Sequence, residues 1–385
     1  MTVCGVICEY DPFHRGHEKH LRLAREMICA DFMVCVMSGS FTQRGLPALL
    51  PPDIRAEMAL RCGADVVLQL PVAFSVREAE YFALGGVYIL HQLGCVTHLS
   101  FGCETDDLAL LTQAVALLEF PDEAFNAALR NGLDRGLSYA SAQGKALTER
   151  LGLPAGTLSA PNTALALCYL RALRRLNSPI AQAPILRSGD YHAGELTDEP
   201  SASAMRAALL RGDWAGVTEA IPEEALDTLW RGVACGVCRP DALDGVLRAR
   251  LLTASLEEIA RWPGISEGLE RRILRTAETT VSREALIAQV KTRRYTWGRI
   301  SRAMCWGLLG VTKTDLPTLP VSARILGFRE RARPLLRIMR DSGFPLYTRP
   351  ARSGAALDVY ADELWRIGAG LPRGETFRRS PVIIP

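Results

Sequence analysis

The N-terminal segment constrains the fold most strongly, because it changes from a strand pattern to a helix pattern across one short turn. Residues 2–8 are apolar and rich in β-branched side chains, which is typical of a parallel strand covered on both faces. Asp11-Pro12 interrupts this pattern. After Gly16 the apolar residues recur at three- and four-residue steps, which predicts a helix with its first turn at residues 16–19. We therefore expect a strand, a tight turn and a helix at the mouth of a parallel sheet.

His14-Arg15-Gly16-His17 lies in this turn. A helix start directs unpaired N–H groups and the positive end of the helix dipole toward an anion. Gly16 lets the backbone approach a phosphate, and the imidazoles of His14 and His17 can donate to oxygens that gain charge as pyrophosphate leaves. Two further donors follow, Lys19 and His20. The pattern predicts a phosphate-binding turn with His14 and His17 as catalytic residues; two surface histidines on an ordinary turn are the alternative.

The composition is that of a globular protein. A chain of 385 residues is long enough for two or three domains. Hydrophobic residues make up 48% and charged residues 23%, and since no apolar run approaches the length of a membrane span, we expect no membrane partner. The N-terminus lacks the layout of a signal peptide, so we expect a cytoplasmic location. The sequence leaves the oligomeric state open.

The eleven cysteines are scattered through apolar patterns, which favours buried thiols in a reducing compartment over a disulfide framework. Cys235 and Cys238 form the one C-x-x-C pair. No second pair follows at zinc spacing, so we predict no metal site.

Strands and helices alternate in the first half of the chain, which implies a parallel sheet. The pattern predicts strands at residues 32–37, 65–70, 96–101 and 183–187, helices at 53–62, 78–93 and 161–176, and a helical insertion at 106–160. Ligands of such sheets bind beyond the carboxyl ends of the strands. Residues 38–45 and 101–104 are therefore candidates to line a nucleotide site, with plain turn chemistry as the alternative.

Polar residues near two later helix starts are further candidates. Asn162 follows Pro161 at the start of one helix, where a capping role is the ordinary explanation. Arg187 is the final residue of the last strand predicted from the pattern. Ser203 is predicted to cap the next helix, and Arg206 lies on the same face, so the pair offers a second place for phosphate oxygens.

The net charge is unevenly distributed. It is +3 overall, but residues 285–353 contain fourteen Lys and Arg against three Asp and Glu, which gives +11 there and leaves −8 elsewhere. A concentrated basic face fits a polyanionic partner, because each phosphate contact releases counterions. From residue 213 onward we expect helices throughout.

Basic and aromatic side chains mix in this segment, as on surfaces that bind single-stranded or loop RNA. One helical stripe is predicted to carry Arg329, Arg333, Arg337 and Arg340. The alternative is a solvated helix face with the aromatic residues in the core, but the scarcity of acidic partners weakens it for the arginines. The candidate RNA-binding residues are Lys291, Arg293, Arg294, Arg299, Arg302, Arg333 and Arg337, with Tyr295, Trp297 and Trp306 among them.

Several ordered segments together resemble the bacterial tRNA(Met) cytidine acetate ligases, which are nucleotidylyltransferases with an H-x-G-H motif. The resemblance runs nearly end to end and is carried by residues 9–17, 38–45, 55–59, 79–83, 101–102, 161–162, 187, 191–192, 201–206 and 292–296. Together with the patterns above, it implies an α/β fold class. A Rossmann-like, parallel-sheet nucleotidylyltransferase domain (1–212, with insertion 106–160) would bind ATP, and an all-helical basic domain (213–385) would bind tRNA.

The resemblance also implies a two-step reaction. Acetate attacks the α-phosphate of ATP to give acetyl-adenylate and pyrophosphate, and N4 of the wobble cytidine of elongator tRNA(Met) then takes the acetyl group. Mg²⁺ is expected to be carried on the ATP phosphates. The ATP-binding residues implied by the resemblance are Ile7, Cys8, Glu9, Tyr10, Asp11, Pro12, Phe13, His14, Arg15, Gly16, His17, Glu18, Lys19, His20, Gly102, Asn162 and Arg187. Ser203 and Arg206 are expected to assist them.

This chain departs from the usual pattern of the family at Asp11, Ser40, Cys103 and Ala193. Asp11 introduces a negative charge near the expected polyphosphate. Two other functions remain open. A small-molecule nucleotidylyltransferase acting on a phosphorylated metabolite would use the same histidines but leaves the basic segment unexplained. A non-catalytic RNA-binding protein would not need His14, Gly16 and His17.

Overall fold

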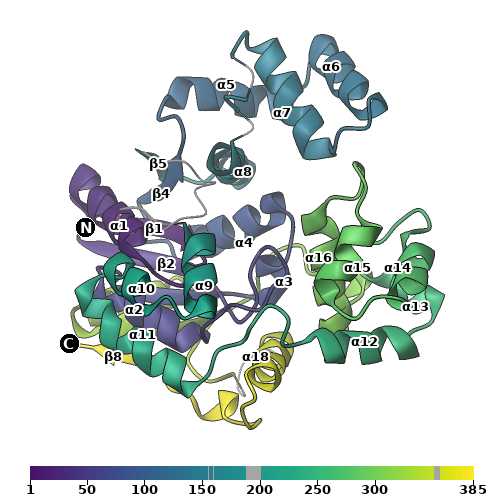
Figure 1. The fold of residues 1–385 in the computed structure, drawn as a ribbon. Helices are drawn as coiled ribbons and strands as arrows, with labels where there is room; N and C mark the ends of the chain where they lie inside the picture. Colours follow the sequence, from purple (N-terminus) through teal and green to yellow (C-terminus); the bar gives the residue numbers. More distant parts are fainter. Residues whose placement is uncertain (155, 159, 188–200, 351–355) are drawn as a thin grey trace.

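The computed structural model describes residues 1–154, 156–158, 160–187, 201–350 and 356–385, and its centre is a mixed, mostly parallel sheet (Figure 1). The strands of the described residues are β1 Val3–Cys8, β2 Phe32–Ser38, β3 Val66–Leu70, β4 His98–Cys103, β5 Ala181–Leu186, β6 Ala323–Arg329, β7 Leu346–Tyr347 and β8 Val382–Ile384. Their order is β5-β4-β1-β2-β3-β6-β7, and β8 also pairs with β6. The predicted α/β parallel sheet is confirmed, and β1 lies inside it between β2 and β4.

The helices of the first half are α1 Arg15–Ile28, α2 Pro52–Arg61, α3 Val72–Ser75, α4 Ala79–Gln92, α5 Leu108–Glu119, α6 Glu123–Asp134, α7 Tyr139–Arg150, α8 Pro161–Arg175 and α9 Ala202–Arg211. Those of the second half are α10 Trp214–Ala220, α11 Glu223–Cys235, α12 Asp244–Thr253, α13 Leu256–Arg261, α14 Leu269–Ala277, α15 Arg283–Val290, α16 Trp297–Leu309, α17 Arg333–Asp341 and α18 Ala356–Gly368. No helix in these described ranges combines the length and apolar character that a membrane crossing requires.

Helices cover both faces of the sheet, because successive side chains of a strand point to opposite sides. Val3 and Ile7 of β1 pack in one core cluster with α4 and α8, whereas Cys4 and Val6 pack in a second cluster with α1, α2 and α11. A strand buried on both faces needs the continuous apolar sequence that β1 has. Because β1 and β4 pair in parallel, their carboxyl ends lie at the same edge of the sheet, near the start of α1.

Two groups of helices stand away from the sheet. α5, α6 and α7 follow β4 and form the upper part of the molecule in Figure 1, and α12–α16 form a lobe beside it. The core of the lobe contains the buried side chains of Trp262, Ile300 and Trp306, and it continues into residues of α3 and α18. The helical character of residues 106–150 agrees with the pattern in the sequence, whereas the domain boundaries at 160 and 212 stay predictions.

The structure corrects the prediction that residues 213–385 are helical throughout. β6 pairs antiparallel with β3, in the register Val66↔Phe328, and β7 and β8 add to β6, so the chain returns to the central sheet. Arg329 is the last residue of β6, and α17 begins only at Arg333, so the predicted four-arginine stripe does not lie on one helix. β6 has basic residues near both ends, so its short apolar centre does not stand out as a strand in the sequence.

Candidate active site

The H-x-G-H turn is built by a histidine that caps its own helix. His14 is the N-cap of α1 with extended backbone (φ −151°), and its Nδ1 accepts a hydrogen bond from the Gly16 N–H at 3.1 Å. The ring of His17 stacks on that of His14, with 3.7 Å between ring centroids. Behind the pair, Tyr10 and Phe13 are buried and contact the His17 ring, so these two residues form a wall for the histidines.

The local hydrogen bonds determine what His14 can do. Because Nδ1 accepts from Gly16, the proton of the neutral ring is on Nε2, which is left as a donor. Burial lowers the pKa of His14 to about 3, and the nearby guanidinium groups of Arg187 and Arg206 contribute to this lowering. Burial, followed by the charge of His14, also holds the pKa of His17 well below its ordinary value. Both rings are therefore neutral donors at neutral pH.

Arg187 lies where the sequence places it, beside the three histidines of the turn. Burial lowers the pKa of His20 to about 4, and the Arg187 charge contributes, as it does for His14 and His17. His20 Nε2 also shares a hydrogen bond with Ser100 Oγ on β4 at 3.0 Å. The Arg187 side chain passes over Gly102: a Cβ at position 102 would lie 2.9 Å from Arg187 Cδ. Predicted ATP-binding residues from three segments of the chain thus meet at the ends of β1 and β4.

Folding stability is expected to depend on pH through these histidines. In the unfolded chain a histidine titrates near pH 6.5, whereas the folded pKa values of His14 and His20 are about 3 and about 4. Between these values the unfolded state binds more protons, so the free energy of unfolding should rise with pH and level off above about 6.5. Each such proton contributes a slope of about 1.4 kcal/mol per pH unit.

Urea unfolding measured from about pH 5 to about pH 8 checks this expectation. The variant His14→Asn should show a slope smaller by about one proton below pH 6.5, because one lowered pKa is lost. A profile that is equally steep for the variant and the unchanged chain would contradict it.

Arg206 is close to the turn but is already partnered. Its Nη1 donates to the Asp11 backbone oxygen at 2.8 Å and lies 3.4 Å from Asp11 Oδ2, while Nη2 donates to Ser203 Oγ at 3.0 Å. Ser203 is not the helix cap that the sequence predicts. Ser201 caps α9 instead, since its Oγ accepts from the Ala204 N–H at 3.1 Å.

The departures from the family pattern have structural partners. The Asp11 carboxylate is buried, accepts from the Leu49 N–H at 2.7 Å and faces Arg206, so its charge is compensated within the protein. Ser40 Oγ donates to Asp362 Oδ1 on α18 at 2.5 Å. Ala193, together with Tyr191 and His192, lies outside the described residues.

Arg55 holds together the chain segments around the site, a role that the sequence alone does not indicate. It is fully buried on α2 and donates to four backbone carbonyl oxygens. These belong to Glu9 (2.5 Å), Leu50 (3.0 Å), Ser38 (3.1 Å) and Gly39. Glu9 Oε1 in turn accepts from the Gln43 N–H at 2.6 Å. Arg55 and Glu9 therefore tie the segment after β1 to residues 38–45 after β2.

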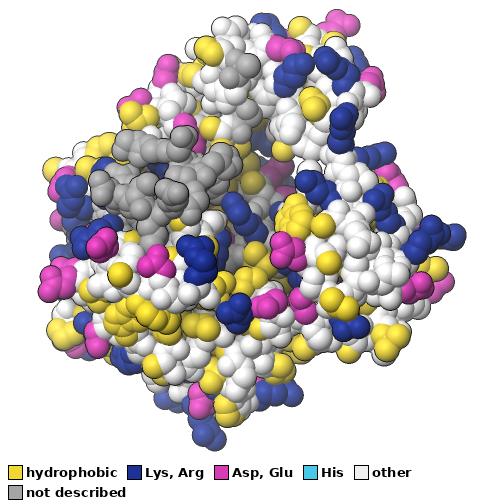
Figure 2. All heavy atoms as spheres, in the orientation of Figure 1, with side chains coloured by type: hydrophobic (Ala, Val, Ile, Leu, Met, Phe, Trp, Pro, Cys, Tyr) yellow, Lys and Arg dark blue, Asp and Glu magenta, His cyan; other side chains and the backbone are white. Residues whose placement is uncertain are grey.

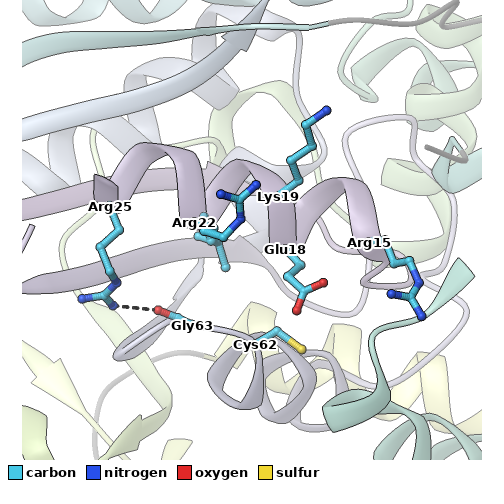
Figure 3. A pocket seen from close by; sticks show the side chains of 8 residues that line it. Arg15, Glu18, Lys19, Arg22, Arg25, Cys62 and Gly63 are labelled. Carbon is cyan, nitrogen blue, oxygen red and sulfur yellow. Dashed lines mark hydrogen bonds between the residues drawn. The ribbon is translucent and has the colours of Figure 1, made fainter. Parts of the chain in front are cut away.

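The remaining predicted ATP-binding residues of α1 divide between two faces. Arg15, Glu18 and Lys19 line a cavity of about 620 Å³ between α1 and the end of α2, together with Leu21, Arg22, Arg25, Cys62 and Gly63 (Figure 3). None of the three histidines lines this cavity. Glu18 points toward Cys62, whereas Lys19 extends from the opposite side of the helix in Figure 3. Arg15 and Glu18 thus face away from the histidine pair.

One group of side chains in the described residues has the spacing of metal ligands. Donor atoms of Glu18, Cys62 and Glu224 lie within 4.8 Å of one another. The same cavity is lined by Arg15, Lys19, Arg22 and Arg25, and their positive charges oppose a bound cation. Cys238 is buried and Cys235 is exposed, and both thiols are free.

The candidate RNA-binding residues differ in their contacts with the rest of the protein. Lys291, Arg293 and Arg294 are on the segment between α15 and α16, and Arg294 pairs with Glu267 at 2.6 Å. Arg299 donates to the Gly264 oxygen at 2.8 Å, and Arg302 lies 4.0 Å from Glu78. The local sequence does not reveal these partners, because they come from other segments of the chain. Arg333 and Arg337 are exposed on α17, and Arg333 pairs with Glu330 at 3.1 Å.

The aromatic residues of this segment also divide. Trp306 is buried in the core of the lobe, whereas Trp297 is 38% exposed. Figure 2 shows a hollow between the upper helices, the lobe and the sheet, with Lys and Arg side chains along its rim. Arg293 reaches the opposite side: a Cβ on Gly136, after α6, would lie 3.8 Å from Arg293 Cδ.

Comparison with known proteins places this geometry in a family. The family model described as HIGH Nucleotidyl Transferase matches residues 1–370. A tRNA(Met) cytidine acetate ligase of Acetivibrio thermocellus is 37% identical over 365 residues, covering 90% of this chain and 88% of the relative. The chain belongs to the tRNA(Met) cytidine acetate ligase family of HIGH nucleotidyl transferases. The ligase-family resemblance inferred from the motifs is thereby confirmed.

Other members of the family agree with this assignment. The enzyme of the same name from Syntrophomonas wolfei is 34% identical over 371 residues, covering 93% of this chain and 89% of its own. The solved structure of Thermotoga maritima TmcAL bound with alpha-thio ATP superposes with a TM-score of 0.90 at 29% identity, covering 100% of both chains. The nucleotidyl transferase fold implied by the resemblance is confirmed.

Proposed function

We propose that this chain is an ATP-dependent ligase that activates acetate as acetyl-adenylate and transfers the acetyl group to N4 of the wobble cytidine of elongator tRNA(Met). The observation that carries the proposal is the stacked, neutral pair His14 and His17 at the start of α1, with Arg187 beside it. Cytoplasmic tRNA is the substrate that this function requires, so we propose a cytoplasmic location.

The site fits a nucleoside triphosphate. Among the described residues the buried His17 Nδ1 has no hydrogen-bond partner, and Arg187 is exposed at the end of β5. A helix N-terminus, two neutral donors and a guanidinium form a cradle for phosphate oxygens. Within the described part of this cradle, no group of three ligand side chains has the spacing of a metal site. We propose that Mg²⁺ is carried on the ATP phosphates.

In the first step an acetate oxygen attacks the α-phosphorus of ATP. The bond from that phosphorus to the bridging oxygen breaks, and the electron pair leaves with pyrophosphate. His14 Nε2–H and His17 donate to the oxygens that gain charge, and because both rings are neutral they give up no proton. In the second step cytidine N4 attacks the acetyl carbonyl, AMP leaves with the electron pair of the acyl–oxygen bond, and the nitrogen loses one proton. Most of the rate acceleration of this second step comes from holding the two reactants in position.

The experiment that tests the proposal is incubation of the protein with ATP, Mg²⁺ and labelled acetate, with and without unmodified elongator tRNA(Met), followed by nucleoside analysis of the RNA. Labelled N4-acetylcytidine should form only when ATP and that tRNA are both present. If ATP is instead consumed with a phosphorylated metabolite and the RNA stays unlabelled, the chain is a small-molecule nucleotidylyltransferase.

The tRNA surface makes a separate prediction. We propose that the basic residues of the second half bind tRNA, and the exposed cations Lys291 and Arg293 between α15 and α16 support this. Replacing Arg333 and Arg337 by Glu should weaken tRNA binding and lower the salt slope by about one for each phosphate that is no longer neutralised. Lys291→Ala with Arg293→Ala should act in the same direction. Acetate activation should be unchanged in both double variants.

Filter binding at several salt concentrations measures these effects. Arg211→Glu, an exposed position at the end of α9 and outside the basic segment, is the matched control and should leave the slope unchanged. An unaltered slope for the α17 variant alone would move the RNA surface to the segment between α15 and α16.

A further inference from the structure

Glu104, directly after β4, holds the first turn of α8 through four hydrogen bonds. Its Oε1 accepts from the Asn162 backbone N–H at 3.3 Å and from Asn162 Nδ2 at 2.7 Å. Its Oε2 accepts from the Thr163 N–H at 2.6 Å and from Thr163 Oγ1 at 2.7 Å. Burial raises the pKa of Glu104, but the hydrogen bonds from Thr163 and Asn162 outweigh it and hold that pKa below its usual value.

An ionised carboxylate only accepts hydrogen bonds, so it determines which way the Asn162 side chain is turned. The amide nitrogen must face Glu104, and the carboxamide oxygen Oδ1 must point away from it. Thr163 is fully buried, and its Oγ1 also lies 3.5 Å from Cys103 Sγ on β4. The start of α8 is thus fixed to the end of the strand, which gives the Asn162 amide one orientation.

The end of β4 is also an edge of the candidate ATP site. Gly102 lies two residues before Glu104, and the Arg187 side chain packs on it. We propose that Glu104 is a positioning residue that presents Asn162 Oδ1, as a hydrogen-bond acceptor, to a donor on the nucleoside part of ATP. This inference rests on the proposed ATP-dependent function.

The hydrogen-bond donors of ATP limit which part of the nucleotide Asn162 Oδ1 can contact. An ionised triphosphate has acceptors and no donors, so an oxygen acceptor such as Asn162 Oδ1 does not suit it. The donors of ATP are the two ribose hydroxyls and the 6-amino group of adenine. Asn162 is therefore assigned to the nucleoside, while the histidines and Arg187 are assigned to the phosphates.

A double-mutant cycle in the full-length protein tests the positioning role. Alpha-thio ATP binding is measured by calorimetry for the unchanged chain, Glu104→Gln, Asn162→Ala and the double variant. Glu104→Gln should weaken binding by about tenfold, because the glutamine amide can turn the Asn162 amide around. In the Asn162→Ala background the same change should have little further effect.

A purely structural role gives a different result. If Glu104 only caps α8, Glu104→Gln lowers the thermal midpoint and weakens binding by the same factor in both backgrounds. Thr163→Val is the matched control, because it removes one hydrogen bond to Oε2 but leaves the Asn162 contact. It should lower the thermal midpoint and leave nucleotide affinity unchanged.

Nucleotide analogues identify the donor. ATP lacking the 2′-hydroxyl, ATP lacking the 3′-hydroxyl and purine riboside triphosphate, which lacks the 6-amino group, each remove one candidate. One of them should bind about tenfold more weakly than ATP to the unchanged chain, and that difference should disappear in Glu104→Gln.

Three outcomes overturn the inference. These are equal effects of Glu104→Gln in both backgrounds, unchanged binding in Asn162→Ala, or equal binding of ATP and all three analogues. If the unchanged chain binds no ATP, the inference and the proposed function both fall. If it binds ATP and acetylates tRNA but shows no coupling, only the inference falls.

Discussion

Replacing His14 by Asn is expected to reduce acetyl-adenylate formation by about 10²- to 10³-fold while the protein stays folded. An asparagine oxygen can accept from the Gly16 N–H as His14 Nδ1 does, so the cap of α1 is kept. What is lost is the Nε2–H donor toward the departing pyrophosphate. Acetate-dependent exchange of pyrophosphate into ATP measures the first step without tRNA. A rate within about threefold of the unchanged chain would remove His14 from the chemistry.

The control for this prediction separates chemistry from folding. His17→Ala should lower the exchange rate to a similar degree and leave tRNA binding nearly intact, because the proposed RNA surface lies on other elements. The two changes should not add, since the stacked rings act as a unit. His91→Ala, on α4 and bonded to Ser178 at 3.1 Å, should leave the exchange rate unchanged. Loss of both exchange and tRNA binding would indicate misfolding.

The parts of the candidate site whose places in the fold follow from the sequence are the local ones. A strand, a turn and a helix start follow one another within a few residues, so no distant contact is needed to place His14, Gly16 and His17. Arg187 and Gly102 were harder, yet parallel strands bring their carboxyl ends together. The sequence marks residues 101–104 as candidates to line a nucleotide site, but it does not predict the contact of Glu104 with α8, because the first turn of that helix lies 58 residues further along the chain.

The wrong predictions for β6 and for the cap of α9 both concern features that the local sequence pattern does not determine. The sequence predicts helix where β6 lies and places Arg329 on a helical stripe, but Arg324 of the same strand is buried against Asp362 of α18 at 3.2 Å. The compensating carboxylate comes from a segment that the local pattern does not contain. The sequence predicts Ser203 as the cap of α9, but Ser201 caps it, because only the backbone shows which of the two serines precedes the helix.

Arg55→Met is expected to lower the free energy of unfolding by at least about 3 kcal/mol. The guanidinium donates to carbonyl oxygens of Glu9, Ser38, Gly39 and Leu50, and methionine would leave these buried acceptors without a donor. Arg55→Lys should recover little, because a single ammonium lacks the planar fork that reaches several acceptors at once. Chemical unfolding gives the free energy when the denaturant slope is the same for each variant.

Arg61→Met is the matched control, because it makes the same side-chain change on the same helix. Arg61 is partly exposed and pairs with Glu57 at 2.9 Å, so its loss should cost less than about 1 kcal/mol. Equal costs at the two positions would contradict the role given to Arg55. A larger cost at Arg55 means that the segments after β1 and β2 are held by one buried cation. The H-x-G-H turn is then positioned by a residue that contacts neither the histidines nor, by our assignment, the nucleotide.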